Sequence, residues 1–438
     1  MRTRLAYKRL AGNKNFRLLL LAQGISNMGD WLVIGILLAF AQREAGTFAA
    51  AGVLVAKLLP ALIFSPLIGA LVDRVDRKKG MILCDIIRGL LIFALAFLLM
   101  LNNIWLVLLI IFLVELFTLF YVPAKDASIP NMVDKELILT ANSLSFTINQ
   151  MTMLFGLAFG ATVVLVVNKI WAFVPIFKDF LGSYTAVFID GLTFFTSAII
   201  LLFVVLPKPK RLGKQSYHSI LGDITDTFDF LKKYPKIRSI IISAGVSVFG
   251  LGTILAVGTD FSKRVLGGEQ DVLPLLTTLA FGLFTGAILV GKISRFTTKE
   301  NIFSASMLFL GLALSAFALS SNYLVAIILG FSSGFGLGML YVSTYTMLHE
   351  YVADVIRGRL ITTLEADLRL AVLISAVIAA ALTKAFGNTR TIQLASLTYP
   401  LPGSRLVLIF GGLVVIFTSV FAFFSVKHHK GELSLDID

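Results

Sequence analysis

The sequence contains very little cysteine, histidine or charge. Its 438 residues include one cysteine and four histidines, and only 14% of them are charged. The single Cys84 excludes a disulfide within the chain, and no Cys or His residues have the spacing of a structural metal site. We therefore expect neither a metal nor another cofactor. The chain also lacks a Walker loop and a catalytic Ser and His set, which argues against an ATP-driven pump or an enzyme.

Hydrophobic residues make up 57% of the chain and are gathered into long uninterrupted runs, such as MILCDIIRGLLIFALAFLLM and LVLIFGGLVVIFTSVFAFF. A run of about 20 apolar residues crosses a bilayer core of about 30 Å as an α-helix. The runs lack the alternation of polar and apolar residues that is typical of membrane β-strands. The sequence therefore predicts an all-α membrane protein.

Breaks that contain charged, Gly, Pro or Asn residues divide the chain into twelve candidate transmembrane helices. These are expected at 16–41, 49–72, 80–101, 104–124, 138–167, 184–206, 237–262, 272–293, 301–319, 322–347, 360–384 and 404–426.

The distribution of basic residues predicts the orientation of these helices. The net charge is +13, but the basic residues lie in short loops between apolar runs, so we do not expect nucleic acid as a partner. Most of the 38 Lys and Arg residues fall in the two terminal segments and in alternate loops, and away from the span ends the spans keep only Lys57, Arg88 and Arg369. We expect a multi-pass protein of a bacterial inner (plasma) membrane with both termini in the cytoplasm.

The chain shows signs of an internal duplication. LVDRVDRKK after the second span resembles LVGKISRFTTK after the eighth, and YVPAKDASIPNMV from Tyr121 resembles YVSTYTMLHEYV from Tyr341. Each pair lies about half the chain length apart, which favours two six-helix halves in parallel register. We predict an N-terminal half at 1–206 and a C-terminal half at 237–438.

The longest polar stretch, residues 207–236, joins these halves. Ile220, Ile224, Phe228 and Leu231 recur there at helical spacing, which indicates a short amphipathic helix at the inner membrane face. A solvated connector without any further role is the alternative.

The loop after the second span carries a recognisable motif. GALVDRVDRKKG resembles the signature loop of the major facilitator superfamily, with matches at Gly69, Leu71, Asp73, Arg74, Arg77 and Lys78. The resemblance implies two six-helix halves around a central cavity. LFYVPAKDASIPNMVDKELILTANSLS, FIDGLTFFTSAIILL and VIRGRLITTL also resemble the drug and macrolide exporters of the drug:proton antiporter branch, which includes siderophore exporters.

One segment departs from this branch. Many of its members carry a glycine-proline signature in helix five, whereas the fifth span here has FGLAFGATVV, with Gly156 and Gly160 and no proline. This departure leaves antiport and the direction of transport open.

The resemblance implies a cytoplasmic gate, because in the superfamily the loop aspartate contacts the start of helix eleven. Here that contact would join Asp73 to residues 358–361. The expected gate residues are Gly69, Asp73, Arg74, Arg77, Lys78, Asp85, Arg88, Arg295 and Glu365. Among them, Asp85 and Arg88 are three residues apart and are expected to form an ion pair on one helix face. The alternative is that the loop charges only set the topology.

Few ionisable side chains lie inside the predicted spans. Asp30 lies in SNMGDWLVIG and Glu115 in LLIIFLVELFTLF. Helices one, four, seven and ten line the cavity in the superfamily, so the resemblance implies that both carboxylates face it. A carboxylate in a partly dry cavity can take up and release protons, and we therefore predict a coupling role for both.

Static roles are the alternative for the same side chains. Asp30 could be held by hydrogen bonds at a helix irregularity, and Glu115 could pair with Lys57 or Arg88. Lys57 could line the cavity or extend outward to the membrane surface.

The tenth span offers only neutral polar groups. Its candidate cavity donors are Ser332, Ser333, Tyr341, Ser343 and Tyr345. A cavity with few charges and scattered hydroxyls suits a bulky lipophilic or weakly cationic solute.

We therefore predict a proton-coupled exporter of amphipathic small molecules that works by alternating access as a monomer. Its partners are the small-molecule substrate, protons and the lipid bilayer. A lysophospholipid flippase is one alternative, because YVPAK also resembles that related group. A non-transporting membrane receptor of the same fold is another.

Overall fold

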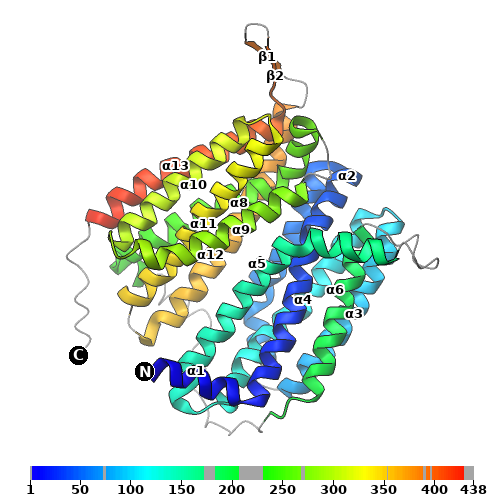
Figure 1. Cartoon of the computed structure of the whole chain (residues 1–438), viewed down its shortest axis with the longest axis vertical. Helices are drawn as coiled ribbons and strands as arrows, with labels where there is room; N and C mark the ends of the chain where they lie inside the picture. Colours follow the sequence, from blue (N-terminus) through cyan, green and yellow to red (C-terminus); the bar gives the residue numbers. More distant parts are fainter. Residues whose placement is uncertain are drawn as a thin grey trace. The chain divides into compact units, whose positions relative to one another are not determined.

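The structure is a computed structural model that describes residues 2–72, 75–171, 183–206, 230–267, 272–352, 354–387, 391–394 and 397–428. The described chain is almost wholly helical (Figure 1). Contacts divide it into two compact units. The first unit contains Met1–Phe40 and Ala56–Tyr217, and the second contains Ala41–Val55 and His218–Asp438.

The first unit is built from long helices joined by short turns. Its elements are α1 (Arg2–Gly12), most of α2 (Lys14–Val72), α3 (Arg77–Met100), α4 (Ile104–Ser128), the 3-10 turns η1 (Ile129–Asn131) and η2 (Lys135–Leu137), α5 (Ile138–Trp171) and α6 (Ser183–Leu202). Helix α3 packs against both α4 and α6 (Figure 1). The predicted spans from the third to the sixth therefore coincide with α3, α4, α5 and α6.

Helix α2 contains the first two predicted spans. It bends at Ala45 and Gly46, where the backbone leaves the helical conformation. Gly46 has a φ of 74°, in the left-handed region that glycine adopts without a steric penalty. The bend lies in the predicted break between the first two spans.

The second unit holds the rest of the predicted spans. Its elements are α8 (Pro235–Phe261), the π-helical turn η4 (Ser262–Leu266), α9 (Val272–Ile293), α10 (Lys299–Leu319), α11 (Tyr323–Tyr351), α12 (Asp354–Phe386), β1 (Thr391–Leu394), β2 (Leu397–Pro400) and α13 (Gly403–His428). Among the described residues, ten helices are long and apolar enough to cross a membrane, and one of the ten is the bent helix at Lys14–Ser65. The count of twelve spans stays a prediction.

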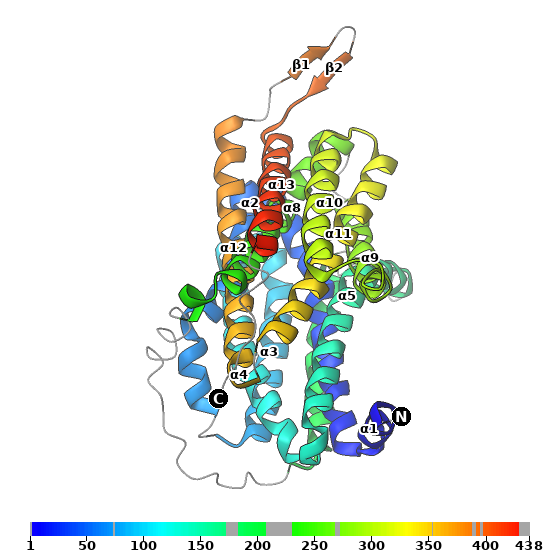
Figure 2. The ribbon, with the colours of Figure 1, turned by 90° about the vertical axis from the view of Figure 1, so that its left-hand side faces the viewer.

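A β-hairpin interrupts the helical chain between α12 and α13. Strands β1 and β2 pair antiparallel, with Thr391 opposite Pro400, and the hairpin projects beyond the ends of the two helices (Figure 2). Its TIQL and LTYP segments contain the β-branched and aromatic residues that favour strands. The prediction of an all-α protein did not include these two strands.

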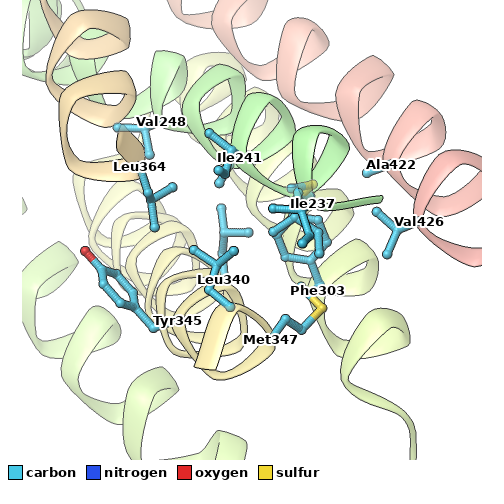
Figure 3. Close-up of a cluster of buried hydrophobic side chains, with 14 of the residues drawn as sticks. Ile237, Ile241, Val248, Phe303, Leu340, Tyr345, Met347, Leu364, Ala422 and Val426 are labelled. Atoms are coloured by element: carbon cyan, nitrogen blue, oxygen red, sulfur yellow. The ribbon is translucent and has the colours of Figure 1, made fainter. Parts of the chain in front are cut away.

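Each unit has its own hydrophobic core. In the first unit, Leu19 and Phe16 of α2 pack with Met81 of α3 and Phe120 of α4. The second core lies among α8, α10, α11, α12 and α13 (Figure 3). The side chains labelled there are Ile237, Ile241, Val248, Phe303, Leu340, Tyr345, Met347, Leu364, Ala422 and Val426.

Glycines allow a very close approach of α9 and α11. A Cβ at Gly334 of α11 would collide with the carbonyl of Leu279, and one at Gly338 with that of Leu283. Gly282 of α9 has the same relation to the backbone of Phe331. The two helices therefore pack backbone against backbone, as small residues at four-residue spacing permit in membranes.

The predicted linker 207–236 falls largely outside the described residues, because 207–229 are not among them. The amphipathic helix expected at Ile220, Ile224, Phe228 and Leu231 therefore stays a prediction.

Candidate transport site

Lys57 and Glu115 form an ion pair in the first unit. Lys57 of α2 donates from Nζ to Oε1 of Glu115 in α4, and the two side chains are only 19% and 15% exposed. Nζ of Lys57 also lies 5.9 Å from the centre of the Trp31 ring. Of the two partners considered for Glu115, Lys57 is the one it contacts. The same contact directs the Lys57 side chain toward α4. In the alternative considered above, Lys57 would extend outward to the membrane surface.

Asp30 of α2 shares its surroundings with a second carboxylate, Asp190 of α6. Asp190 is buried and packs with Thr193 against Gly29, where a Cβ would collide with both side chains. Oγ1 of Thr193 donates to the Asp190 carbonyl oxygen at 2.7 Å. Asp190 interacts electrostatically with Asp30 and Lys57. Asp190 was not among the predicted site residues, since spacing alone does not show that α6 meets Gly29.

Asp85 and Arg88 form the predicted ion pair on α3. The pair is fully enclosed, with 0% and 2% of the two side chains exposed. Oγ of Ser197 in α6 donates to Oδ2 of Asp85 at 2.7 Å, and Nη1 of Arg88 donates to Oγ1 of Thr118 in α4 at 3.3 Å. The pair thus braces α3 against both neighbouring helices.

Two aromatic rings enclose the Arg88 guanidinium. Its central carbon lies 4.6 Å from the centre of the Tyr121 ring and 4.4 Å from that of Phe194. This arrangement suits the planar guanidinium, which stacks on aromatic faces while its edge forms hydrogen bonds.

Together these side chains form what we call the intramembrane charge group. It consists of Asp30, Asp85, Glu115 and Asp190 with Lys57 and Arg88. Four carboxylates therefore share two cations. Since Arg88 binds Asp85 and Lys57 binds Glu115, the charge of Asp30 and Asp190 is the least compensated part of the group.

A polar seam joins α2 to α5 beside this group. Nδ2 of Asn27 donates to the Asn149 carbonyl at 3.0 Å and to Oγ1 of Thr152 at 2.6 Å. Nε2 of Gln23 donates to Oδ1 of Asn149 at 3.2 Å. The Asn27 side chain therefore joins α2 to α5. The static alternative required instead that Asp30 be held by hydrogen bonds at a local helix irregularity.

The signature loop is described only in part. Asp73 and Arg74 lie outside the described residues, and Gly69 lies in the last turn of α2. Nη1 of Arg77 donates to the Ala127 carbonyl at 2.7 Å, and Nζ of Lys78 donates to the Leu202 carbonyl at 2.8 Å. These two cations bind carbonyls at the ends of α4 and α6, where the helix dipole favours positive charge. The gating role of the loop stays a prediction.

A second polar cluster lies between α11 and α12 in the second unit. The hydroxyl of Tyr345 donates to Oε1 of Glu365, and the hydroxyl of Tyr341 does so at 3.5 Å. The Tyr345 ring belongs to the second hydrophobic core, while its hydroxyl points away from the apolar side chains of that core (Figure 3). The structure therefore brings Glu365, expected at the gate, together with two tyrosines expected in the cavity.

The other predicted residues of the second unit lie apart from this cluster. Oγ of Ser332 and Oγ of Ser333 donate within α11, to the carbonyls of Ile328 and Leu329. Ser333 lines a pocket of only about 20 Å³ with apolar neighbours, which is too small for a drug-sized molecule. Arg295 is exposed beyond the end of α9.

The sequence matches a known family over most of its length. The sequence model of the Major Facilitator Superfamily matches residues 19–301. The chain belongs to this superfamily. It is therefore a membrane transporter of the major facilitator fold, with its helices in the multi-pass arrangement of that family.

The relatives include efflux-type proteins and a further transporter of the same superfamily. The chain is 28% identical over 377 residues to the proposed bacilysin exporter BacE of Bacillus subtilis, covering 83% of this chain and 87% of BacE. It is 27% identical over 311 residues to the transporter YfiS of Bacillus subtilis, covering 68% and 69% of the two chains. It is 24% identical over 262 residues to macrolide efflux protein A of Enterococcus faecalis, covering 59% and 76%.

Solved structures show the same fold. A bacterial homologue of the human lysosomal transporter Spinster, in an inward-facing and unoccupied conformation, aligns with a TM-score of 0.71 and 15% identity over 94% of this chain and 97% of that one. The nucleoside transporter NupG aligns with a TM-score of 0.67 and 12% identity over 94% and 100%. At this level of identity the likeness concerns the fold alone.

Proposed function

We propose that this transporter exports amphipathic small molecules in exchange for protons, and that the intramembrane charge group couples the two movements. The observation that supports this proposal is the imbalance of four carboxylates and two cations in that group. Two carboxylates in one site of low dielectric repel each other, so one of them readily holds a proton. Asp30 and Asp190 are in this situation.

The proton would move as the cavity opens to each side in turn. Asp30 is partly accessible and Asp190 is buried beside it, so Asp30 is the group that exchanges a proton with water. Lys57 adjoins both carboxylates through its electrostatic interactions. A proton on Asp30 therefore removes one of the negative charges that attract Lys57. Lys57 then interacts more exclusively with Glu115.

The efflux-type relatives support the direction and the substrate class. BacE and macrolide efflux protein A carry names that describe the outward movement of bacilysin and of macrolides. The Tyr341, Tyr345 and Glu365 cluster would offer aromatic faces and one carboxylate to a lipophilic or weakly cationic solute. We place both termini in the cytoplasm, and take residues 1–206 and 237–438 as the two moving halves.

The test is transport by purified protein in sealed vesicles with an imposed proton gradient. Lipophilic dyes and macrolides are compared with labelled lysophospholipid. Gradient-driven movement of dyes or macrolides supports the proposal. Movement of lysophospholipid alone, without dependence on the gradient, would identify a flippase instead, and no movement of any probe would favour the receptor alternative.

The site is tested with Asp30→Asn and Asp190→Asn. We expect both to lose gradient-driven accumulation while substrate still moves down its own gradient. Asp134→Asn is the matched control, because Asp134 is an exposed carboxylate beyond α4. Unchanged coupling in both site variants would remove the two residues from the mechanism.

A further inference from the structure

The helix that precedes the first span, α1, concentrates positive charge at one end of the first unit. Its sequence, RTRLAYKRLAG, contains four basic residues and no acidic one. Two more basic residues, Lys14 and Arg17, follow in the first turn of α2. The function proposed above makes no use of this segment.

Contacts with the first unit fix α1 in place. Leu10 is 1% exposed and belongs to the core of that unit, and Ala6, one turn before it, packs against the same core. Helix α1 also contacts α5. One face of α1 is therefore held by the bundle.

Asn13 turns the chain between α1 and α2. Its Oδ1 accepts a hydrogen bond from the backbone N–H of Phe16 at 3.1 Å, which caps the start of α2. Its Nδ2 donates to the Met132 carbonyl at 2.7 Å, in the turn that follows α4. Helix α1 therefore runs crosswise to α2 instead of extending it (Figure 1, Figure 2).

The basic side chains of this segment remain open to the surroundings. We call basic surface the four that are exposed there, namely Lys8, Arg9, Lys14 and Arg17. No side-chain ion pair or hydrogen bond joins any of the four to another described residue. By contrast, Arg77 and Lys78 of the same unit donate to carbonyls at helix ends. The basic surface therefore has four cations whose charge the described chain does not neutralise.

The position of the basic surface favours a lipid partner. The first candidate span begins at Lys14, so these cations lie where a membrane helix leaves the bilayer. Anionic headgroups occupy this level, and they attract basic segments that adjoin a span. Tyr7 is 46% exposed on α1 and adds an aromatic ring of the kind that is enriched at the headgroup level. Nucleic acid or an acidic protein would have to approach the same surface along the bilayer.

We propose that α1 and the first turn of α2 bind the headgroups of anionic phospholipids, and that the basic surface supplies the attraction. The hydrogen bond from Asn13 to Met132 ties this surface to the turn after α4. Bound lipid therefore stabilises the packing of α1 on the first unit. Binding of this kind depends neither on the transported substrate nor on protons.

Lipid binding is tested by hydrogen–deuterium exchange of the full chain in nanodiscs. One set of discs contains phosphatidylcholine alone, and the other contains phosphatidylglycerol in addition. We expect the amides of α1 to exchange more slowly with phosphatidylglycerol, because bound headgroups oppose local opening of the helix. High salt should remove most of this difference, since it screens the attraction. Inorganic phosphate added to the phosphatidylcholine discs should not reproduce it.

The double variant Lys8→Gln with Arg9→Gln tests the basic surface, while Lys14 and Arg17 keep the charge beside the span. We expect the phosphatidylglycerol content that gives half of the protection to rise roughly tenfold, because two cations are lost. Lys8→Arg with Arg9→Lys preserves the charge and is the matched control. Lys263→Gln removes an exposed cation of the second unit and controls for net charge. Both controls should behave like the unaltered protein.

The outcomes separate this inference from the proposed function. Equal exchange of α1 in both kinds of disc would overturn the inference, and so would protection by phosphatidylglycerol that persists fully in the double glutamine variant. Protection by inorganic phosphate alone would also overturn it, since no lipid would then be needed. Protection that requires phosphatidylglycerol, together with transport that is independent of a proton gradient, would support lipid binding and contradict proton-coupled export.

Discussion

The charged residues inside this transporter are stabilised by contacts with other helices. Glu115 stands in a wholly apolar stretch, yet it is paired with Lys57 of another helix. Arg88 is enclosed by Asp85, Tyr121 and Phe194, which come from three helices. A charge inside a membrane protein is tolerated when partners of this kind surround it. Removing one member is therefore more harmful than removing both.

The Lys57 and Glu115 pair allows a direct test of this argument. Lys57→Met leaves Glu115 partly buried without its cation, and we expect a loss of about 3 kcal/mol of stability. The double variant Lys57→Met with Glu115→Leu should recover most of that loss. Thermal unfolding of purified protein in detergent measures both. The exposed Lys8→Met serves as the control, and equal stability of the single and double variants would contradict the pairing.

Arg88 should be the more sensitive residue, because its pair is fully enclosed. In Arg88→Met the Asp85 carboxylate has 0% exposure and no cation, and we expect about 4 kcal/mol of destabilisation. Asp85→Asn in the same background should restore part of it. The fraction of monodisperse protein on gel filtration after heating reports the change. A protein as stable as the parent would mean that the brace contributes nothing.

At the level of elements, the tightest contact depends on the absence of side chains. The Gly334 and Gly338 positions of α11 face the carbonyls of Leu279 and Leu283 in α9, with no room for a Cβ. Helices in a membrane gain no hydrophobic driving force from one another, so such close packing supplies much of their association.

Substitution of one of these glycines should therefore separate the two helices. Gly334→Val forces the backbones of α9 and α11 apart, and we expect at least about 2 kcal/mol of destabilisation. Gly291→Ala is the matched control on α9, because nothing lies within 4 Å of a Cβ at Gly291. Thermal unfolding compares the two. If Gly334→Val and Gly291→Ala unfold at the same temperature, the close approach is not required.

At the scale of the whole molecule, the distribution of Lys and Arg predicts that both termini face the cytoplasm. We expect a reporter fused to the C-terminus to be active only if it is of the kind that works in the cytoplasm. Cysteines introduced in the β1 to β2 hairpin should react with an impermeant reagent from outside intact cells, and cysteines near Arg295 should not. The reverse labelling pattern would invert the proposed topology.

The positions of the described membrane-length helices followed from the sequence, and so did the family, whereas the short helix α1 was not predicted. The length of each apolar run can be read directly from the sequence, and residues such as Gly46 and Asn103 mark the breaks between runs. The spacing of Asp85 and Arg88 was sufficient to predict their ion pair because both lie on one helix. The two strands, Thr391–Leu394 and Leu397–Pro400, were not predicted, because strands of four residues leave little signal in a sequence dominated by long apolar helices.

Tertiary packing decided which charges meet. Asp190 gained a place in the intramembrane charge group only because Gly29 lets α6 approach α2. Gln42 meets Asp260 only because the bend of α2 brings Gln42 to the end of α8. Contacts between residues so far apart in the chain depend on how helix faces fit together, and a linear pattern of apolar runs contains no record of that fit.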